Sequence, residues 1–197
     1  MEKNKKTPVV LITGFLGTRS TMIPIKLRLE SDGFPVHIYS YELFQISKID
    51  VIANDFSNYC SQLCLIYGYK KLNIVAYSMG GLIAINSLKN NNLYNKIITL
   101  GTPFNGSIFA NFGSIFLKKH LPVLEQMKIN SKFLKNLDSY IYNNKLNLLQ
   151  IDAKNDLIVN TKKMKKITDN YQIIDGGHIS LALLSKTYQY IYEFLNK

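Results

Sequence analysis

Short apolar runs alternate with longer amphipathic stretches along most of this chain. Apolar and β-branched residues dominate the short runs, as is typical of strands buried in a parallel sheet. These predicted strands are residues 9–13, 36–39, 72–76, 97–100, 146–151 and 171–174. Between them, predicted helices cover residues 19–30, 49–67, 79–89, 162–167 and 180–195. This alternation predicts an α/β fold with a mostly parallel sheet of about six strands and helices on both faces.

One segment departs from the alternation. The stretch between residues 100 and 146 is much longer than a simple crossover needs. Its apolar side chains recur at helical spacing with lysines interspersed, which predicts one or two amphipathic helices. These helices either cover a site as a lid or pack on the core. We expect a single domain over residues 1–197, with a lid-like insert at about 104–145.

The strongest chemical signal is the sequence Ala-Tyr-Ser-Met-Gly-Gly at residues 76–81, which follows a predicted strand and opens a predicted helix. A sharp turn between the two elements would hold the Ser78 hydroxyl clear of the backbone. Ala76 and Gly80 are small enough to let the strand and the helix pass closely. Such a spacing also occurs by chance, but this context predicts that Ser78 is a catalytic nucleophile.

A serine hydroxyl needs a base to take its proton, and the chain has three histidines. His37 lies within a predicted strand and is interpreted as structural. His120 lies in the insert beside two lysines that would lower its pKa. His178 follows two glycines after the last predicted strand, so a loop can bring its imidazole to the serine. We therefore predict that His178 is the general base.

The base needs a carboxylate to fix its tautomer. Asp156 follows a predicted strand, and catalytic groups gather at the carboxyl edge of open α/β sheets. Asp152 is nearer to the strand and remains an alternative. Asp175 is a weaker one, because it is close to His178 in sequence. The order serine, acid, histidine along the chain is the one expected for this kind of site.

Two backbone N–H groups should stabilise the charge that develops on a substrate carbonyl oxygen. Met79, directly after the nucleophile, is predicted to supply one of them. Phe15, in the glycine-containing loop at residues 13–17, is predicted to supply the other. This loop does not have the glycine spacing of a phosphate-binding loop, and no Gly-Lys-Ser/Thr follows it. The candidate residues for substrate binding and the lid are Leu16, Phe104, Phe109, Phe112 and Ile115.

The charge of the chain indicates which binding partners are expected. The formal net charge is +11, and lysine supplies most of it. This charge reflects either coding bias or attraction to an anionic membrane surface. Nucleic-acid binding is not expected, because the lysines are scattered and no recognition motif is present.

Cys60 and Cys64 lack the further ligands of a zinc site, so no metal is expected. The chain has no apolar run of membrane-spanning length, and we expect a cytoplasmic protein or a mature form without its leader, with peripheral membrane contact as an option.

With these motifs in view, the chain resembles the α/β-hydrolase lipases and esterases, especially compact bacterial lipases that act on triacylglycerols. The resemblance rests on residues 14–17, 76–81, the Gly-Thr-Pro-x-x-Gly-Ser sequence at 101–107, Asp156 with Val159, and Gly177 with His178. It implies hydrolysis of carboxylic esters, often lipids, without a metal or an organic cofactor. Many such relatives have histidine in place of Thr13 and of Tyr77, which concerns substrate preference more than the reaction.

The sequence therefore predicts a serine ester hydrolase that cleaves acyl esters, with lipid esters as the expected substrates. The catalytic residues would be Ser78, His178 and Asp156, and an acyl-enzyme would be the intermediate. Three alternatives remain open on the same residues: an acyltransferase, a phospholipase, and a binding module that keeps the hydrolase fold without catalysis.

Overall fold

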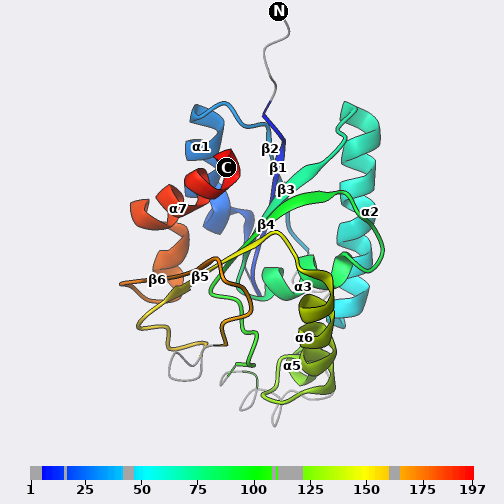
Figure 1. The fold of residues 1–197 in the computed structure, drawn as a ribbon, viewed down its shortest axis with the longest axis vertical. Coiled ribbons are helices and arrows are strands. Elements are labelled where there is room, and N and C mark those ends of the chain that lie inside the picture. Colours follow the sequence, from blue (N-terminus) through cyan, green and yellow to red (C-terminus); the bar gives the residue numbers. More distant parts are fainter. Residues whose placement is uncertain (1–5, 16, 42–46, 108–109, 111–121, 160–164) are drawn as a thin grey trace, which may run out of the picture.

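The computed structural model describes residues 6–15, 17–41, 47–107, 110, 122–159 and 165–197. Within these ranges, six strands form one sheet in the order β2-β1-β3-β4-β5-β6, and all neighbouring strands are parallel (Figure 1). The strands are β1 (Val9–Ile12), β2 (Val36–Tyr39), β3 (Leu72–Tyr77), β4 (Tyr94–Leu100), β5 (Leu148–Ala153) and β6 (Tyr171–Ile174). The predicted fold class is confirmed.

Helices cover both faces of the sheet. One face carries α1 and α7, and the other carries α2, α3 and α6 (Figure 1). The helices are α1 (Ile23–Ser31), α2 (Ile49–Tyr67), α3 (Met79–Ser87), α5 (Pro122–Gln126), α6 (Lys132–Asn144) and α7 (Ser185–Asn196). Two 3₁₀ turns, η1 (Arg19–Met22) and η4 (Ile179–Ala182), precede α1 and α7.

The strand sequences explain why the sheet is covered on both sides. In β3, Ile74 and Ala76 belong to the core under α2 and α3, whereas Val75 and Tyr77 belong to the core under α1 and α7. Successive side chains of a strand point to opposite faces, so a strand between two helical layers must be apolar throughout. All six residues of β3 are buried.

Helix α2 shows how its sequence sets both its packing and its end. Ile49, Ile52, Phe56 and Leu63 lie on its buried face at spacings of three, four and seven residues. Gly68 then ends the helix in a left-handed conformation, with φ 69°. The predicted bounds of this helix, residues 49–67, are confirmed.

Three predicted helices were wrong in part. The helix predicted at 19–30 begins as the 3₁₀ turn η1, and α1 starts only at Ile23. The stretch predicted at 180–195 begins as the 3₁₀ turn η4, and α7 starts only at Ser185, because the Ser180 hydroxyl bonds back to Gly177 and keeps this segment in a tight turn. Residues 165–167 of the helix predicted at 162–167 are not helical, since the amide of Ile167 donates to the Gln150 side chain instead of to a preceding carbonyl. The remainder of that helix lies outside the described residues.

Part of the predicted insert is described. Helices α5 and α6 lie in it, and the buried face of α6 (Leu134, Leu137 and Ile141) packs on the core shared with α2 and α3. Phe104 is buried in the same core at 2% exposure. Leu16, Phe109, Phe112 and Ile115 lie outside the described residues. The described helices of the insert therefore support the sheet, and the lid function stays a prediction.

The topology places a crevice at one edge of the sheet. Strand β1 lies between β2 and β3, so the chain leaves β1 toward one side and returns on the other. Ligands of open α/β sheets bind at such a switch point, outside the carboxyl ends of the strands. Here those ends lead into the loop at residues 13–17 and into Ser78.

Candidate active site

Ser78 occupies a strained turn between β3 and α3. Its backbone has φ 54° and ψ −126°, a region that residues other than glycine rarely adopt. The turn is held from β4 and the segment after it: the Ser78 amide donates to the Leu100 carbonyl at 2.7 Å, and the Thr102 hydroxyl donates to the Ser78 carbonyl at 3.0 Å. The strained backbone is therefore fixed on both sides of the serine.

Close packing of backbone explains the glycines around this turn. A Cβ added at Gly80 would lie 2.7 Å from the Thr13 carbonyl oxygen, and one added at Gly14 would lie 2.8 Å from the Ser78 Cβ. Neither approach leaves room for a side chain. The loop after β1 is thus pressed against the serine, as the predicted roles of both segments require.

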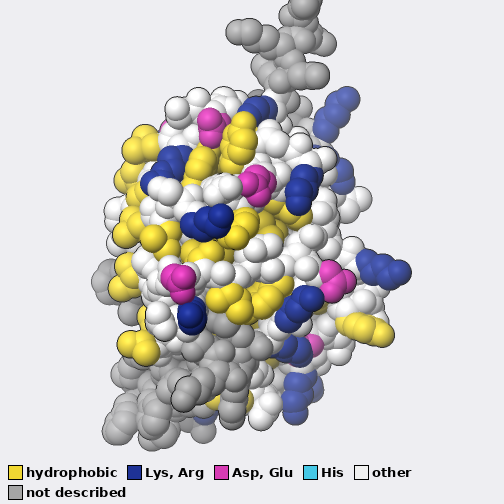
Figure 2. Space-filling view, turned by 60° about the vertical axis from the view of Figure 1, so that its left-hand side comes forward, with side chains coloured by type: hydrophobic (Ala, Val, Ile, Leu, Met, Phe, Trp, Pro, Cys, Tyr) yellow, Lys and Arg dark blue, Asp and Glu magenta, His cyan; other side chains and the backbone are white. Residues whose placement is uncertain are grey.

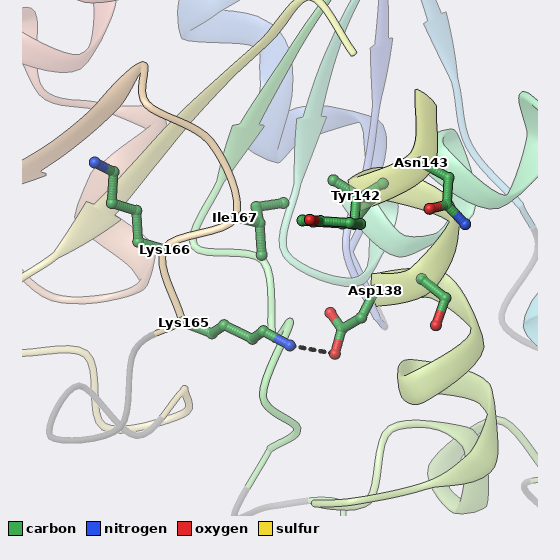
Figure 3. Close-up of a pocket in the computed structure, with 8 residues that line it drawn as sticks. Asp138, Tyr142, Asn143, Lys165, Lys166 and Ile167 are labelled. Atoms are coloured by element: carbon green, nitrogen blue, oxygen red, sulfur yellow. Dashed lines mark hydrogen bonds and ion pairs between the residues drawn. The ribbon is translucent and has the colours of Figure 1, made fainter. Parts of the chain in front are cut away.

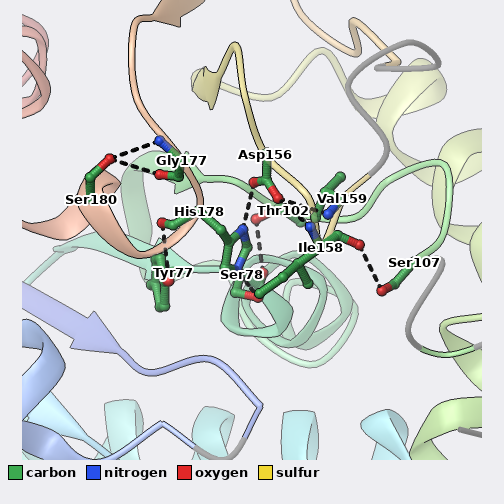
Figure 4. Close-up of polar contacts among 10 residues, drawn as sticks. All are labelled: Tyr77, Ser78, Thr102, Ser107, Asp156, Ile158, Val159, Gly177, His178 and Ser180. Carbon is green, nitrogen blue, oxygen red and sulfur yellow. Dashed lines mark hydrogen bonds and ion pairs between the residues drawn. The ribbon is translucent and has the colours of Figure 1, made fainter.

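Three side chains form a hydrogen-bonded chain at the crevice (Figure 4). The His178 Nε2 lies 2.9 Å from the Ser78 Oγ, and the His178 Nδ1 lies 2.6 Å from the Asp156 Oδ2. All three residues are buried, with exposed fractions of 9% for Ser78, 7% for His178 and 3% for Asp156. The structure therefore brings together the three residues that the sequence selected, with the predicted base between the predicted nucleophile and the predicted acid.

The Asp156 carboxylate is oriented by its own loop. Its Oδ1 accepts hydrogen bonds from the amides of Ile158 at 2.9 Å and Val159 at 2.8 Å. The Ser107 hydroxyl in turn donates to the Ile158 carbonyl at 3.0 Å (Figure 4). These bonds occupy Oδ1 and leave Oδ2 for the imidazole. Ser107 is a support for the acid that sequence reasoning identified only as part of a motif.

The Gly-Thr-Pro sequence has a local function in the site. Gly101 has φ 58°, and a Cβ added to it would lie 3.1 Å from the His178 Nδ1 and 2.7 Å from the Leu181 Cδ1. Its lack of a side chain lets the imidazole lie against the end of β4. Thr102, the next residue, is the one that holds the Ser78 carbonyl.

Tyr77 supports the histidine from the strand itself. Its hydroxyl donates to the His178 carbonyl at 3.1 Å, and the two rings lie 5.1 Å apart (Figure 4). Burial, with a contribution from Asp156, raises the pKa of the Tyr77 hydroxyl to about 12, so it remains a donor near neutral pH. No motif of the sequence pointed to this contact. Strand alternation, which directs residue 77 toward the α7 face, was the available signal.

The alternative acids and bases lie elsewhere or are partnered differently. Asp175 has a side chain that is 90% exposed and pairs with Lys154 at 3.6 Å. His37 lies on β2, where its Nε2 is 3.3 Å from the Tyr69 hydroxyl. Burial, and secondly Lys26, lower the pKa of the His37 imidazole. His120 lies outside the described residues.

Asp152 is a second buried carboxyl group near the first three residues. It lies inside β5 rather than after it, and the Gln150 Nε2 donates to its Oδ2 at 2.7 Å. Burial raises the pKa of the Asp152 carboxyl to about 6, while hydrogen bonds from Gln150 and Tyr171 oppose the rise and the charge of Asp156 adds to it. The imidazole Nδ1 bonds to Asp156 and not to Asp152.

The raised pKa of Asp152 predicts how the stability of the protein changes with pH. The folded state holds the Asp152 proton up to about pH 6, whereas an unfolded chain releases it near pH 4. The free energy of unfolding therefore falls as pH rises through this window. Asp152→Asn should remove that fall. Between pH 4 and pH 7.5, the free energy of unfolding of the variant should therefore rise relative to that of the wild type by on the order of 2–3 kcal/mol. Urea unfolding at both pH values tests this. A difference that stays constant with pH would show that the group does not titrate in this window.

The loop after β1 turns tightly beside the serine. The Gly17 amide donates to the Gly14 carbonyl at 3.0 Å, and Phe15 lies between them on the wall of the pocket described below. Met79 is the first residue of α3, directly after the serine. The assignment of the Phe15 and Met79 N–H groups as carbonyl-oxygen donors stays a prediction.

A largely apolar pocket of about 580 Å³ opens onto the serine and the histidine. Such a volume is within the range of small-molecule sites. The apolar part of its wall comes from the first loop, the acid loop and the η4 segment. The lining residues are Phe15, Gly17, Ser20, Thr21, Tyr77, Ser78, Ile158, His178, Ile179, Ala182 and Leu183. Phe104 does not line this pocket, because it is packed in the core.

A second hollow of about 440 Å³ lies between α6 and residues 165–167 (Figure 3). Its described lining residues include an ion pair between Lys165 and Asp138, and neither histidine nor cysteine is among them. Among the described residues, no group of three or more His, Cys, Asp or Glu side chains could hold a metal ion. Cys60 is buried, and burial raises the pKa of its thiol to about 12.

Comparison with protein families gives one match. The family model described as "Alpha/beta hydrolase of unknown function (DUF915)" matches residues 45–168, well over half of the 197 residues. This range includes Ser78 and Asp156. No curated protein shows significant sequence similarity to the chain.

Solved structures with the same fold include bacterial lipases and esterases. The mature form of the lipase BlEst2 from Bacillus licheniformis is 17% identical, with a TM-score of 0.77 over 98% of this chain and 93% of that one. An α/β hydrolase from a sediment metagenome of the Mar Chica lagoon in Morocco is 19% identical, with a TM-score of 0.70 over 100% and 93%. A thermophilic esterase from Thermogutta terrifontis is 17% identical, with a TM-score of 0.69 over 98% and 90%. At these identities, the likeness shows the fold.

Proposed function

This chain belongs to the DUF915 family of α/β hydrolases, and from that premise we propose that it is a serine hydrolase of carboxylic esters. One observation carries the proposal: the hydrogen-bonded chain from Ser78 through His178 to Asp156, with distances of 2.9 and 2.6 Å, at an apolar pocket. A serine, a histidine and an acid in this geometry are the elements of nucleophilic acyl transfer.

The proposed reaction follows from the contacts. The Ser78 Oγ attacks the ester carbonyl carbon while the His178 Nε2 takes its proton, and Asp156 stabilises the resulting imidazolium through Nδ1. The amides of Phe15 and Met79 would bind the negative oxygen of the tetrahedral intermediate. Collapse expels the alcohol, which takes the proton from Nε2. A water molecule then attacks the acyl-enzyme by the same proton transfers and releases the carboxylic acid.

The substrate side of the proposal is a lipid ester. The pocket wall has the apolar side chains of Phe15, Ile158, Ala182 and Leu183, which suit an acyl chain better than a polar group. Three apolar side chains at this pocket remain exposed: Ile158 at 39%, Ile179 at 74% and Leu183 at 53%. Exposed apolar side chains around a pocket are a common feature of proteins that meet an apolar surface.

The surrounding surface is consistent with a lipid interface. Figure 2 shows the face of α1, α7 and β6, where exposed hydrophobic side chains lie among lysines and arginines, with fewer acidic side chains between them. Exposed hydrophobic residues of these elements are Ile23, Leu27, Ile173 and Tyr192. Together with the net charge of +11, this face suits contact with anionic lipid. No described helix is long and apolar enough to cross a membrane.

One experiment tests the reaction and the substrate class together. The wild-type protein should hydrolyse nitrophenyl esters of short and medium acyl chains, and its rate should rise when the ester passes from monomers into micelles or vesicles. The rise should be larger when the vesicles contain anionic lipid. A rate that depends only on ester concentration would support the proposed hydrolase activity but would contradict the proposed preference for lipid esters. An absence of turnover on every ester would favour a binding module that has the fold without the activity.

A further inference from the structure

The Tyr41 hydroxyl contacts the loop that carries one predicted donor to the carbonyl oxygen. It donates to the Gly14 carbonyl at 2.5 Å and lies 3.5 Å from the Thr13 carbonyl. Tyr41 follows the end of β2, so it reaches this loop from the neighbouring strand. Neither the hydrolase motifs nor their spacing points to residue 41.

The covalent geometry of the peptide bond gives this contact a consequence. The Gly14 carbonyl and the Phe15 N–H belong to one planar trans peptide unit, in which C=O and N–H point in opposite directions. A hydrogen bond that fixes the direction of the carbonyl therefore also fixes the direction of the N–H. The second acceptor bond, from the Gly17 amide at 3.0 Å, holds the same carbonyl within the loop itself.

Glycine makes such a support necessary. Gly14 cannot carry a side chain, because a Cβ there would lie 2.8 Å from the Ser78 Cβ. The same lack of a side chain leaves its backbone free to adopt other conformations. The peptide unit beside the nucleophile is thus one that packing requires to be glycine, and it needs a fixed orientation if its N–H is to bind an oxyanion.

We propose that Tyr41 is a positioning residue that aims the Phe15 N–H into the oxyanion hole by holding the Gly14 carbonyl. This inference rests on the proposed function, because it concerns the same reaction. The bond also polarises the peptide unit, since a carbonyl that accepts a hydrogen bond makes its N–H a stronger donor. Burial raises the pKa of the Tyr41 hydroxyl above its ordinary value, so the hydroxyl keeps its proton and remains a donor.

The test is Tyr41→Phe, which removes the hydroxyl and keeps the ring. Loss of one oxyanion-hole donor typically lowers kcat by about 10²–10³. Because the donor here would be misdirected rather than absent, we expect kcat for a nitrophenyl ester to fall by about 10- to 30-fold, with KM changed less than about twofold. Affinity for a trifluoromethyl ketone, whose adduct carries an oxyanion, should fall by a similar factor. The pH profile of kcat/KM should not shift, because the triad is untouched.

Tyr39→Phe is the matched control. Tyr39 lies two residues earlier, and its hydroxyl donates to the Asp55 Oδ2 at 2.6 Å, away from the loop. This variant should lose a partly buried hydrogen bond and keep kcat within about twofold of the wild type. Active-site titration with a fluorophosphonate refers every rate to folded, competent protein, so a partly unfolded variant still gives a valid comparison.

The outcomes separate this proposal from the proposed function. An active wild type with Tyr41→Phe equal to Tyr39→Phe in kcat and in ketone affinity would overturn the positioning role alone. A shifted pH profile in Tyr41→Phe would also overturn it, because the hydroxyl would then act on the triad. A wild type without ester turnover would overturn the proposed function, and the positioning role with it.

Discussion

Replacing Ser78 with alanine is expected to lower ester turnover by about 10⁴- to 10⁶-fold, to the level set by binding and the oxyanion donors alone. The hydroxyl that would form the acyl-enzyme is then absent, while the backbone contacts of the turn with Leu100 and Thr102 remain. A fluorophosphonate should label the wild type at Ser78 and leave Ser78→Ala unlabelled. Nitrophenyl ester assays and peptide mapping of the labelled protein measure both effects.

The same substitution should leave the fold intact. It removes one side-chain hydrogen bond to His178, which contributes about 0.5–1.5 kcal/mol, and alanine at this backbone conformation is strained to the same degree as serine. Ser61→Ala, on the exposed side of α2, is a suitable control that should retain full activity and labelling. Residual turnover above a tenth of the wild-type rate in Ser78→Ala would show that another group is the nucleophile.

Asp156→Asn is expected to lower kcat by about 10³- to 10⁴-fold with little change in KM. An amide at this position can donate to the His178 Nδ1, which would place the imidazole proton on Nε2. A protonated Nε2 could not accept the proton of the Ser78 hydroxyl, so the imidazole would no longer act as a base. The loop itself should keep its form, since the amide oxygen can still accept from Ile158 and Val159. Steady-state kinetics on a nitrophenyl ester tests the change.

Asp152→Asn is the matched comparison for the acid. Both carboxyl groups are buried and only four residues apart, but only that of Asp156 bonds to the imidazole. Activity of Asp152→Asn should therefore stay within about tenfold of the wild type, although its stability should change with pH as described above. If Asp152→Asn lost more activity than Asp156→Asn, the assignment of the acid would be reversed.

Much of the chemistry was readable from local sequence. Residues 76–81 place a serine between an apolar run and a helical run, and His178 follows a glycine pair at the end of the last strand. Both signals depend on neighbours within a few residues, so they can be recognised without knowing the tertiary structure. The choice among Asp152, Asp156 and Asp175 was different, because all three lie near strand ends and only side-chain direction separates them.

The sequence by itself determined the alternation of strands and helices, the parallel sheet, and the serine and the histidine at its carboxyl edge, because period and turn residues act over short distances. Only the tertiary structure decided how these parts meet. The bond between His178 and Ser78 joins residues 100 positions apart, and Tyr41 reaches Gly14 from a neighbouring strand. Such contacts depend on the register and twist of the whole sheet, which brings distant strand ends to one place and which no local pattern encodes.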